Sequence, residues 1–291
     1  MQLTPWTHTA CEGFVLRGWH SPPSGKPLLH FLHGNGFCGR VYTPMLAPLS
    51  EHFDLWLSDV QGHGDSDHGD RFVGWNRSAD LAAEAFTAHL PLFSDVPRSA
   101  MGHSFGGVLT CLTLAQHPQL FERAVVLDPV LFSPAMLWAM TMAQWTGLSG
   151  HHPLARSARA RRQHWPDRAE AKSSLEGRGT YRGWTDESLQ AFVDHALREA
   201  PEGGISLKCA PQRESEIFSS APQGLWSALS RITTPTLMLH GERTFPFVTA
   251  SARQWQLINP HVESLQVSGG HCFMQEDPIR TAAHANAFLS P

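Results

Sequence analysis

The chain has 291 residues, of which 42% are hydrophobic, and its formal net charge is −4. This composition is typical of a globular protein and excludes an intrinsically disordered one. The small negative charge leaves no basic footprint for nucleic acid, and no apolar run approaches the roughly 20 residues that cross a bilayer. We therefore expect a small-molecule substrate, with neither nucleic acid nor a membrane as a partner.

Two features of the sequence bear on the cellular compartment of the protein. The first residues, MQLTPWTHTACEG, have neither the basic start nor the apolar core of a secretory signal peptide. The cysteines are scattered, odd in number and form no C-x-x-C pair; they are Cys11, Cys38, Cys111, Cys209 and Cys272. Such cysteines are typical of reduced thiols in a cytoplasmic protein. The sequence leaves open whether the protein is a monomer or a homodimer.

Strand and helix patterns alternate over the first 130 residues. Short apolar runs predict strands at 14–19, 28–32, 53–58, 98–101 and 124–127. Helical spacing appears at 78–93, and a second helix is expected at 105–116, directly after a strand. After the opening strand or hairpin, this alternation predicts an α/β fold with a mostly parallel sheet flanked by helices.

The alternation stops after residue 130. Residues 131–230 carry no strong strand signal and read as helices joined by Gly/Pro loops. The pattern resumes with a strand at 236–239, a helix at 248–258, a strand at 262–267 and a last helix near 278–289. We therefore expect one α/β core formed by residues 1–130 and 231–291, split by an inserted helical cap at 131–230.

A serine lies in a glycine-rich turn between a predicted strand and a predicted helix. The stretch AMGHSFGGV places Ser104 in a G-x-S-x-G pattern. A strained turn of this kind needs glycines two residues away on either side, since a Cβ does not fit there. The helix expected to begin at Phe105 offers free N–H groups and partial positive charge to an oxyanion. Ser104 is therefore a candidate nucleophile; the alternative is a helix-capping serine in a packing turn.

Five segments together carry a resemblance to a known family. In chain order they are HGNG at 33–36, DVQGHGDSD at 59–67, GHSFGG at 102–107, LHGE at 239–242 and GGH at 269–271. With them the chain resembles the α/β-hydrolase superfamily, in the branch that has an inserted helical cap. The resemblance implies a serine hydrolase that cleaves an apolar ester or lactone through an acyl-enzyme, with no metal or organic cofactor. The same residues are compatible with carbon–carbon or thioester hydrolysis, and a non-enzymatic ligand receptor on this scaffold is a further alternative.

The resemblance also implies roles for particular residues. Ser104 is the nucleophile, and His271, which follows the last predicted strand, is its base. The backbone N–H groups of Phe105 and Asn35 form the oxyanion hole, with Gly36 or Phe37 as near alternatives to Asn35.

The acid of the triad is less evident. The family often has an aspartate where this chain has Thr244, and a threonine cannot carry the charge. Asp128 directly follows the strand at 124–127, at the same sheet edge as Ser104, and some branches of the family use a carboxylate there. Glu242, in the turn expected after the strand at 236–239, is the alternative. We favour Asp128.

Two further clusters of residues are candidates for a function. Residues 63–70, HGDSDHGD, fit neither an EF-hand nor a zinc site, so we expect these acids to brace a turn that Asp59 anchors, and we expect no metal. Apolar side chains of the cap are candidates for the substrate pocket, because thioethers and aromatic rings suit apolar ligands. The pocket residues that we expect are Phe37, Met136, Met140 and Trp145.

Overall fold

The structure is a computed structural model that describes residues 1–147 and 153–290. Within these residues, eight strands form one large sheet, and its parallel part begins at the third strand in spatial order. In the order in which they lie side by side, the strands are β1 (Thr4–Thr9), β2 (Val15–His20), β4 (Asp54–Asp59), β3 (Leu28–Leu32), β5 (Arg98–His103), β6 (Arg123–Leu127), β10 (Thr236–Arg243) and β11 (Val262–Gly270). The predicted α/β fold with a mostly parallel sheet is confirmed.

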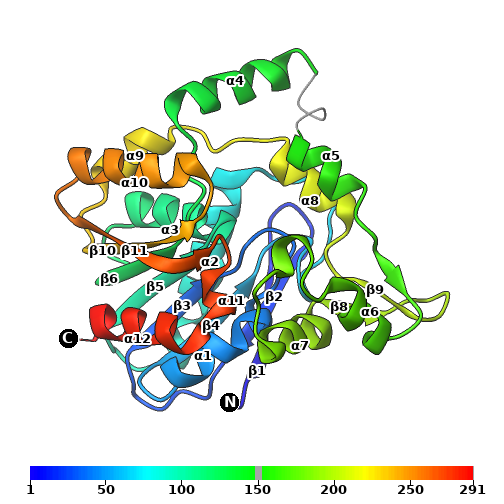
Figure 1. The fold of residues 1–291 in the computed structure, drawn as a ribbon. Helices are drawn as coiled ribbons and strands as arrows, with labels where there is room; N and C mark the ends of the chain where they lie inside the picture. The colour runs from blue at the N-terminus through cyan, green and yellow to red at the C-terminus, as the bar shows by residue number, and fades with distance from the viewer. Residues whose placement is uncertain (148–152, 291) are drawn as a thin grey trace.

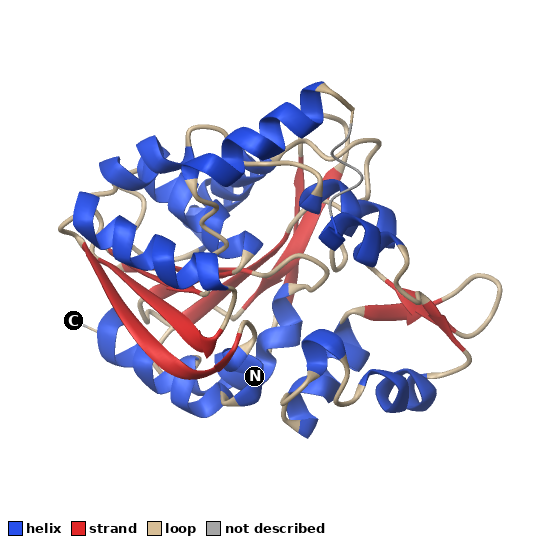
Figure 2. Ribbon diagram, turned by 45° about the horizontal axis from the view of Figure 1, so that its top comes forward, coloured by secondary structure: helices blue, strands red, loops and turns tan. Residues whose placement is uncertain are grey.

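Helices cover both faces of this sheet (Figures 1 and 2). One face carries α2 (Trp75–His89), α3 (Phe105–Gln116), α9 (Leu225–Arg231) and α10 (Pro246–Ile258), and the other carries α1 (Thr43–Leu49) and α12 (Pro278–Leu289). Two apolar cores result, and neighbouring residues of one strand enter different cores: Leu28 lies in one and Leu29 in the other. A strand between two helical layers has no polar face, which explains the continuous apolar run at 28–32.

Some boundaries differ from those that the sequence predicts. The helix expected to reach residue 93 ends at His89, and the chain continues as a 3₁₀ turn, Leu90–Leu92, that contains Pro91. The strand expected at 236–239 extends to Arg243, because its polar end still pairs with β11. Glu242 therefore lies in a strand, and the expectation that it sits in a turn is wrong.

The chain leaves the large sheet between β6 and β10. Its helices there are α4 (Pro134–Trp145), α5 (Pro153–Arg159), α6 (Arg168–Leu175), α7 (Asp186–His195), α8 (Pro211–Phe218) and α9. A small antiparallel sheet in the same segment was not expected; it consists of β7 (His164–Trp165), β9 (Ile205–Leu207) and β8 (Leu197–Glu199). Strands of two or three residues are too short to show a period of two in the sequence. Figure 2 shows this sheet apart from the large one.

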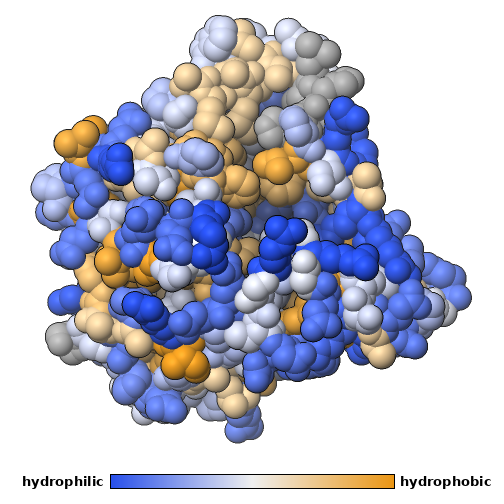
Figure 3. Space-filling model, in the orientation of Figure 1, coloured by the Kyte–Doolittle hydropathy of each residue, from blue (hydrophilic) through white to orange (hydrophobic). Residues whose placement is uncertain are grey.

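Two helices of this segment behave differently from the rest. Helix α9 contacts α3 and α10, and its Leu225 and Leu229 belong to a core of the large sheet. Helix α4 has no buried residue and no charged side chain, and Trp138 on it is 68% exposed. Figure 3 shows apolar surface gathered over α4 at the top of the molecule. No helix of the described residues is both long and apolar enough to span a membrane.

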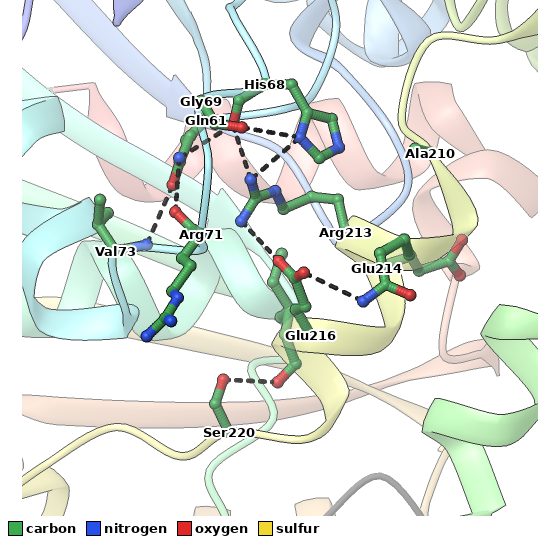
Figure 4. A network of polar contacts seen from close by, with 12 residues as sticks. Gln61, His68, Gly69, Arg71, Val73, Ala210, Arg213, Glu214, Glu216 and Ser220 are labelled. Atoms are coloured by element: carbon green, nitrogen blue, oxygen red, sulfur yellow. Dashed lines mark hydrogen bonds and ion pairs between the residues drawn. The ribbon is translucent and has the colours of Figure 1, made fainter. Parts of the chain in front are cut away.

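A buried arginine joins α8 to the loop that follows β4. The guanidinium of Arg213 is fully buried and donates to the carbonyl oxygen of His68 at 2.7 Å and to Glu216 at 2.7 Å. The side-chain amide of Gln61 donates to the same carbonyl of His68 and to that of Arg71 (Figure 4). Helix α8 of the inserted segment is thus fixed to the loop at 61–73 by a charge-assisted hydrogen bond from a buried guanidinium.

Candidate active site

Three strand ends meet at one edge of the large sheet. Ser104 directly follows β5, Asp128 directly follows β6, and His271 directly follows β11. These strands run parallel, so their carboxyl ends lie on the same side of the sheet. The side chains that the sequence singles out at these positions are therefore brought together.

Ser104 stands on a strained turn. Its φ is +53°, a value that a residue other than glycine rarely adopts. A Cβ at Gly102 would lie 2.4 Å from the carbonyl oxygen of Gly106, and a Cβ at Gly106 would lie 2.3 Å from that of Leu32. Both positions thus require glycine. The Ser104 side chain makes no capping bond to helix α3, which leaves its hydroxyl free for another partner.

That partner is the imidazole of His271. The Nε2 atom lies 2.9 Å from Oγ of Ser104, and Nδ1 lies 2.6 Å from Oδ2 of Asp128. An ionised carboxylate only accepts hydrogen bonds, so Nδ1 carries the proton and Nε2 accepts from the serine hydroxyl. This tautomer is the one that a general base for Ser104 needs.

Asp128 is completely buried and has a φ of +44°. Its Oδ1 accepts from the backbone N–H of Gly241 at 2.8 Å, and its Oδ2 accepts from both His271 and the hydroxyl of Thr244. Its own N–H donates to the carbonyl of Leu239 at 2.7 Å, which ties the turn to β10. Hydrogen bonds of this number are what a carboxylate needs in a site without water.

The alternative acid, Glu242, does not lie at the imidazole. Its carboxylate accepts from Arg243 at 2.6 Å and from the hydroxyl of Ser268 at 3.1 Å, and its side chain is 47% exposed. The continuation of β10 to Arg243 explains this placement, because it carries Glu242 along the strand instead of turning it toward His271.

Two backbone N–H groups are free to donate: one belongs to Phe105 and the other to the loop after β3. Phe105 is the first residue of α3, and its N–H has no hydrogen-bond partner among the residues that the structure describes. In the loop, the N–H of Gly36 donates to His63 at 3.0 Å and that of Phe37 donates to Gly34 at 3.1 Å. Within the described residues, the N–H of Asn35 has no such partner. Of the three residues considered for this role, Asn35 is thus the one with a donor to offer.

Buried histidines hold this loop in place. His33 donates from Nδ1 to the carbonyl of Gly34 at 2.9 Å and accepts from the N–H of Val60 at 3.0 Å, so it orders its own loop. Burial lowers the pKa of His33 to about 4 and that of His63 well below its usual range, so both rings are neutral. The role of His63 was not anticipated from the sequence.

His103 makes a hydrogen bond with each of its two ring nitrogens. Its Nδ1 lies 2.6 Å from the hydroxyl of Tyr42, and its Nε2 lies 3.0 Å from the carbonyl oxygen of His271. This role of His103 was not expected from the GHSFGG motif. The position of His103, one residue before the nucleophile, was the available signal.

The expected pocket residues take different places. Phe37 is buried and packs edge-on against Trp184 and Phe192 of the inserted segment. Met136 and Met140 lie partly buried against a core of the large sheet, whereas Trp145 is 82% exposed. The expectation that Trp145 lines a pocket is wrong in this structure, because its side chain faces solvent near the end of α4.

A row of aromatic rings leads away from His271 and was not anticipated. The ring of Phe245 lies 5.0 Å from the imidazole of His271, Phe247 lies 5.7 Å from Phe245, and Phe132 lies 5.6 Å from Phe247. The stretch FPF at 245–247, directly after β10, was the signal in the sequence.

The opposite side of the site is polar. Arg161 donates to Glu214 at 2.8 Å and also to the hydroxyl of Tyr181, and its side chain and that of Glu214 are mostly buried. A Cβ at Gly36 would lie 3.2 Å from both Arg161 and Glu214. The side-chain amide of Asn35 donates to the carbonyl of Glu214 at 3.1 Å. This ion pair of the inserted segment therefore rests directly on the loop that carries the Asn35 N–H.

The acids at 59–70 have structural partners. Asp59 accepts from the N–H groups of Gly39 and Asp65, which confirms that it anchors its loop. Asp67 pairs with Arg17 at 2.5 Å, and Asp65 pairs with Lys208 at 2.7 Å. These contacts brace the turn and join it to the inserted segment.

Known proteins show the same architecture. Residues 31–284 match the model of the alpha/beta hydrolase family. A pimeloyl-[acyl-carrier protein] methyl ester esterase from Chromobacterium violaceum is 28% identical over 231 residues, which cover 75% of this chain and 76% of that protein. A protein of the same name from Xanthomonas oryzae is 25% identical over 84% of this chain and 87% of its own. The crystal structure of E-2-(acetamidomethylene)succinate hydrolase superimposes with a TM-score of 0.79 at 21% identity, over the full length of both chains. The match to the family model spans most of the sequence and both parts of the large sheet. The chain belongs to the alpha/beta hydrolase family.

Proposed function

We propose that this protein is a serine esterase in which Ser104 is the nucleophile, His271 the general base and Asp128 the acid that orients it. The observation that carries the proposal is the unbroken line of hydrogen bonds from Ser104 Oγ through His271 to Asp128, at 2.9 Å and 2.6 Å. The relatives that match most of the chain are named esterases.

The proposed reaction has two halves. In the first, Nε2 of His271 takes the proton of Ser104 as Oγ bonds to the ester carbonyl carbon. The N–H groups of Phe105 and Asn35 hold the oxygen as it becomes negative, a contribution worth about 3 kcal/mol for each donor. The bond to the alcohol oxygen then breaks, and His271 returns the proton to that oxygen. In the second half, water replaces the alcohol, the same steps release the acid, and Ser104 regains its proton.

The aromatic row supports an ester with an apolar portion. Phe245, Phe247 and Phe132 extend from His271 toward α4, and Met136 and Met140 are partly buried there. Burying an alkyl chain against these side chains contributes about 0.8 kcal/mol for each methylene. We further propose that the inserted segment from α4 to α8 serves as a lid over the site. Helix α9 packs in a core of the large sheet, so the expected boundary of the cap at residue 230 lies too far along the chain.

The receptor alternative has lost its main support. It depended on the lack of an acid at Thr244, and Asp128 supplies a carboxylate to His271 from the neighbouring strand end. A complete Ser–His–Asp arrangement favours turnover over simple binding.

Hydrolysis of p-nitrophenyl esters of increasing acyl length tests the proposal, with a thioester and a diketone assayed in parallel. Ser104→Ala should abolish hydrolysis and labelling by a fluorophosphonate probe. Ser173→Ala is the matched control, because Ser173 is an exposed residue of α6 and should change neither. Ester hydrolysis that persists in Ser104→Ala would contradict the proposal, and faster cleavage of the thioester or the diketone than of every ester would change the substrate class.

A further inference from the structure

Thr244 follows the end of β10, which runs parallel to β6 and extends beyond it. Asp128 follows β6 and Thr244 follows β10, and these strands pair in register up to Leu127 and Leu239. The Thr244 hydroxyl contacts Oδ2 of Asp128, the same oxygen that receives the proton of His271 Nδ1. Since the carboxylate only accepts, the threonine must donate.

We propose that Thr244 is a positioning residue for the triad, which holds the Asp128 carboxylate in the orientation that meets His271. The inference rests on the proposed function and adds to it. Two of the three hydrogen bonds to the Asp128 side chain come from the β10 end, from the Gly241 N–H and the Thr244 hydroxyl. Together they fix the plane of the carboxylate relative to the imidazole.

The hydroxyl also affects the charge of the carboxylate. A donor on Oδ2 draws negative charge away from the oxygen that stabilises the imidazolium. Without it, the carboxylate should hold the protonated imidazole more strongly, and the acid limb of the kcat/KM profile should move to higher pH. The other titratable groups near this site are His240 on β10, Cys272 beside His271, and His103 on β5. They are the same in every variant, so a shift reports on Thr244.

One experiment compares Thr244→Val with Thr244→Ser by their kcat, KM and pH profile in the hydrolysis of p-nitrophenyl butyrate. Valine keeps the shape of threonine without the hydroxyl, whereas serine keeps the hydroxyl. We expect Thr244→Val to lower kcat about tenfold, with KM changed less than about twofold and the acid limb at higher pH, and Thr244→Ser to restore both. The rate of fluorophosphonate labelling should follow the same order.

Thr234→Val is the matched control. The Thr234 hydroxyl is buried just before β10 and has no hydrogen-bond partner among the described residues, so this change should leave kcat and the pH profile unchanged. The positioning role is wrong if Thr244→Val and Thr244→Ser behave alike, or if Thr244→Val lowers kcat/KM equally at every pH.

The outcomes separate the two ideas. If Ser104→Ala retains activity, the proposed function fails. If Ser104→Ala is inactive but Thr244→Val and Thr244→Ser behave alike, the proposed function stands and the positioning role of Thr244 is wrong.

Discussion

The Nε2 atom of His103 lies 3.0 Å from the backbone carbonyl oxygen of His271. On its other side, His103 meets the hydroxyl of Tyr42, which accepts from the N–H of Gly34 at 3.0 Å. The carbonyl oxygen only accepts, so Nε2 of His103 carries the ring proton and donates to it. Nδ1 of His103 therefore accepts from the hydroxyl of Tyr42. Burial keeps the pKa of His103 well below its usual range, which agrees with a neutral ring. A buried chain of hydrogen bonds thus joins the loop of Asn35 to the loop of His271.

Tyr42→Phe tests this chain. The change removes one hydroxyl and leaves two buried groups, the Gly34 N–H and His103 Nδ1, without their partner. We expect the free energy of unfolding to fall by about 1–3 kcal/mol. We also expect kcat to fall about tenfold with little change in KM, because both loops touch the reacting groups. Urea denaturation and steady-state kinetics measure the two effects, and an unchanged kcat would show that the chain serves stability alone.

The identity of the acid is directly testable. Asp128→Asn should lower kcat by about 10³ to 10⁴, since the carboxamide cannot stabilise the imidazolium. Glu242→Gln should change kcat less than about twofold, because its carboxylate contacts Arg243 and Ser268. Circular dichroism confirms that both variants fold. The reverse order of the two effects would exclude Asp128 as the acid.

The ion pair that rests on the loop of Asn35 offers a third prediction. Glu214→Gln leaves the guanidinium of Arg161 mostly buried without its carboxylate, at a cost of about 3–5 kcal/mol in stability. Because Gly36 lies against this pair, kcat should also fall. Glu170→Gln is the matched control: its pair with Arg162 is half exposed and worth at most about 1 kcal/mol. Thermal denaturation of the two variants compares the pairs, and equal effects would remove any special role for Glu214.

Chain-length preference should depend on the aromatic row. Phe247→Ala should lower the ratio of kcat/KM for the octanoate ester to that for the acetate ester by about tenfold, because a stacked ring between Phe245 and Phe132 is lost. Trp145→Ala, at an exposed position, should leave the ratio unchanged. A ratio that changes only in Trp145→Ala would place the acyl chain along α4 instead.

Buried histidines predict a loss of stability in acid. Burial lowers the pKa of His30 to about 3 and that of His33 to about 4, from 6.5. The unfolded chain takes up protons that the folded protein refuses, so stability is lost as the pH falls below about 6.5, by about 2 kcal/mol for each histidine at pH 5. Asp59 opposes this: burial raises its pKa to about 6, so the folded protein gains about 1 kcal/mol between pH 7 and pH 5.

Urea denaturation at pH 7 and pH 5 measures the net loss. His30→Phe keeps the stacking on Phe86 and Phe121 and removes the titrating ring, so the difference between the two pH values should shrink by about 2 kcal/mol. An equal difference in wild type and variant would mean that His30 does not contribute to the acid sensitivity.

Local sequence determines the elements that could be predicted. The run at 28–32 is apolar because both faces of β3 are covered, and the turn at Ser104 needs its glycines because backbone atoms lie within 2.4 Å of where each Cβ would be. Such requirements restrict a few consecutive residues, so the strands, the strained turn at Ser104 and the order of the elements could be predicted.

Contacts between distant segments impose no such local restriction. The bond from Thr244 to Asp128 joins residues 116 positions apart, and that from His103 to His271 spans 168 positions. Their geometry depends on the pairing of β6 with β10 and on the path of the last loop, which no local pattern encodes. The small sheet β7–β9–β8 is a similar case, because its strands are defined by their partners more than by their own residues.

Strand β6 lies between β5 and β10, so the carboxylate stands on the strand next to that of the serine. In the proposed mechanism, the residues at 245–247 therefore supply no charge, although Phe245 lies against the imidazole of His271. In natural or engineered variants, the segment that begins at Phe245 can be replaced by others of different length and bulk without displacing Asp128. In this arrangement, substitutions can change the substrate preference while the position of the Asp128 carboxylate stays the same.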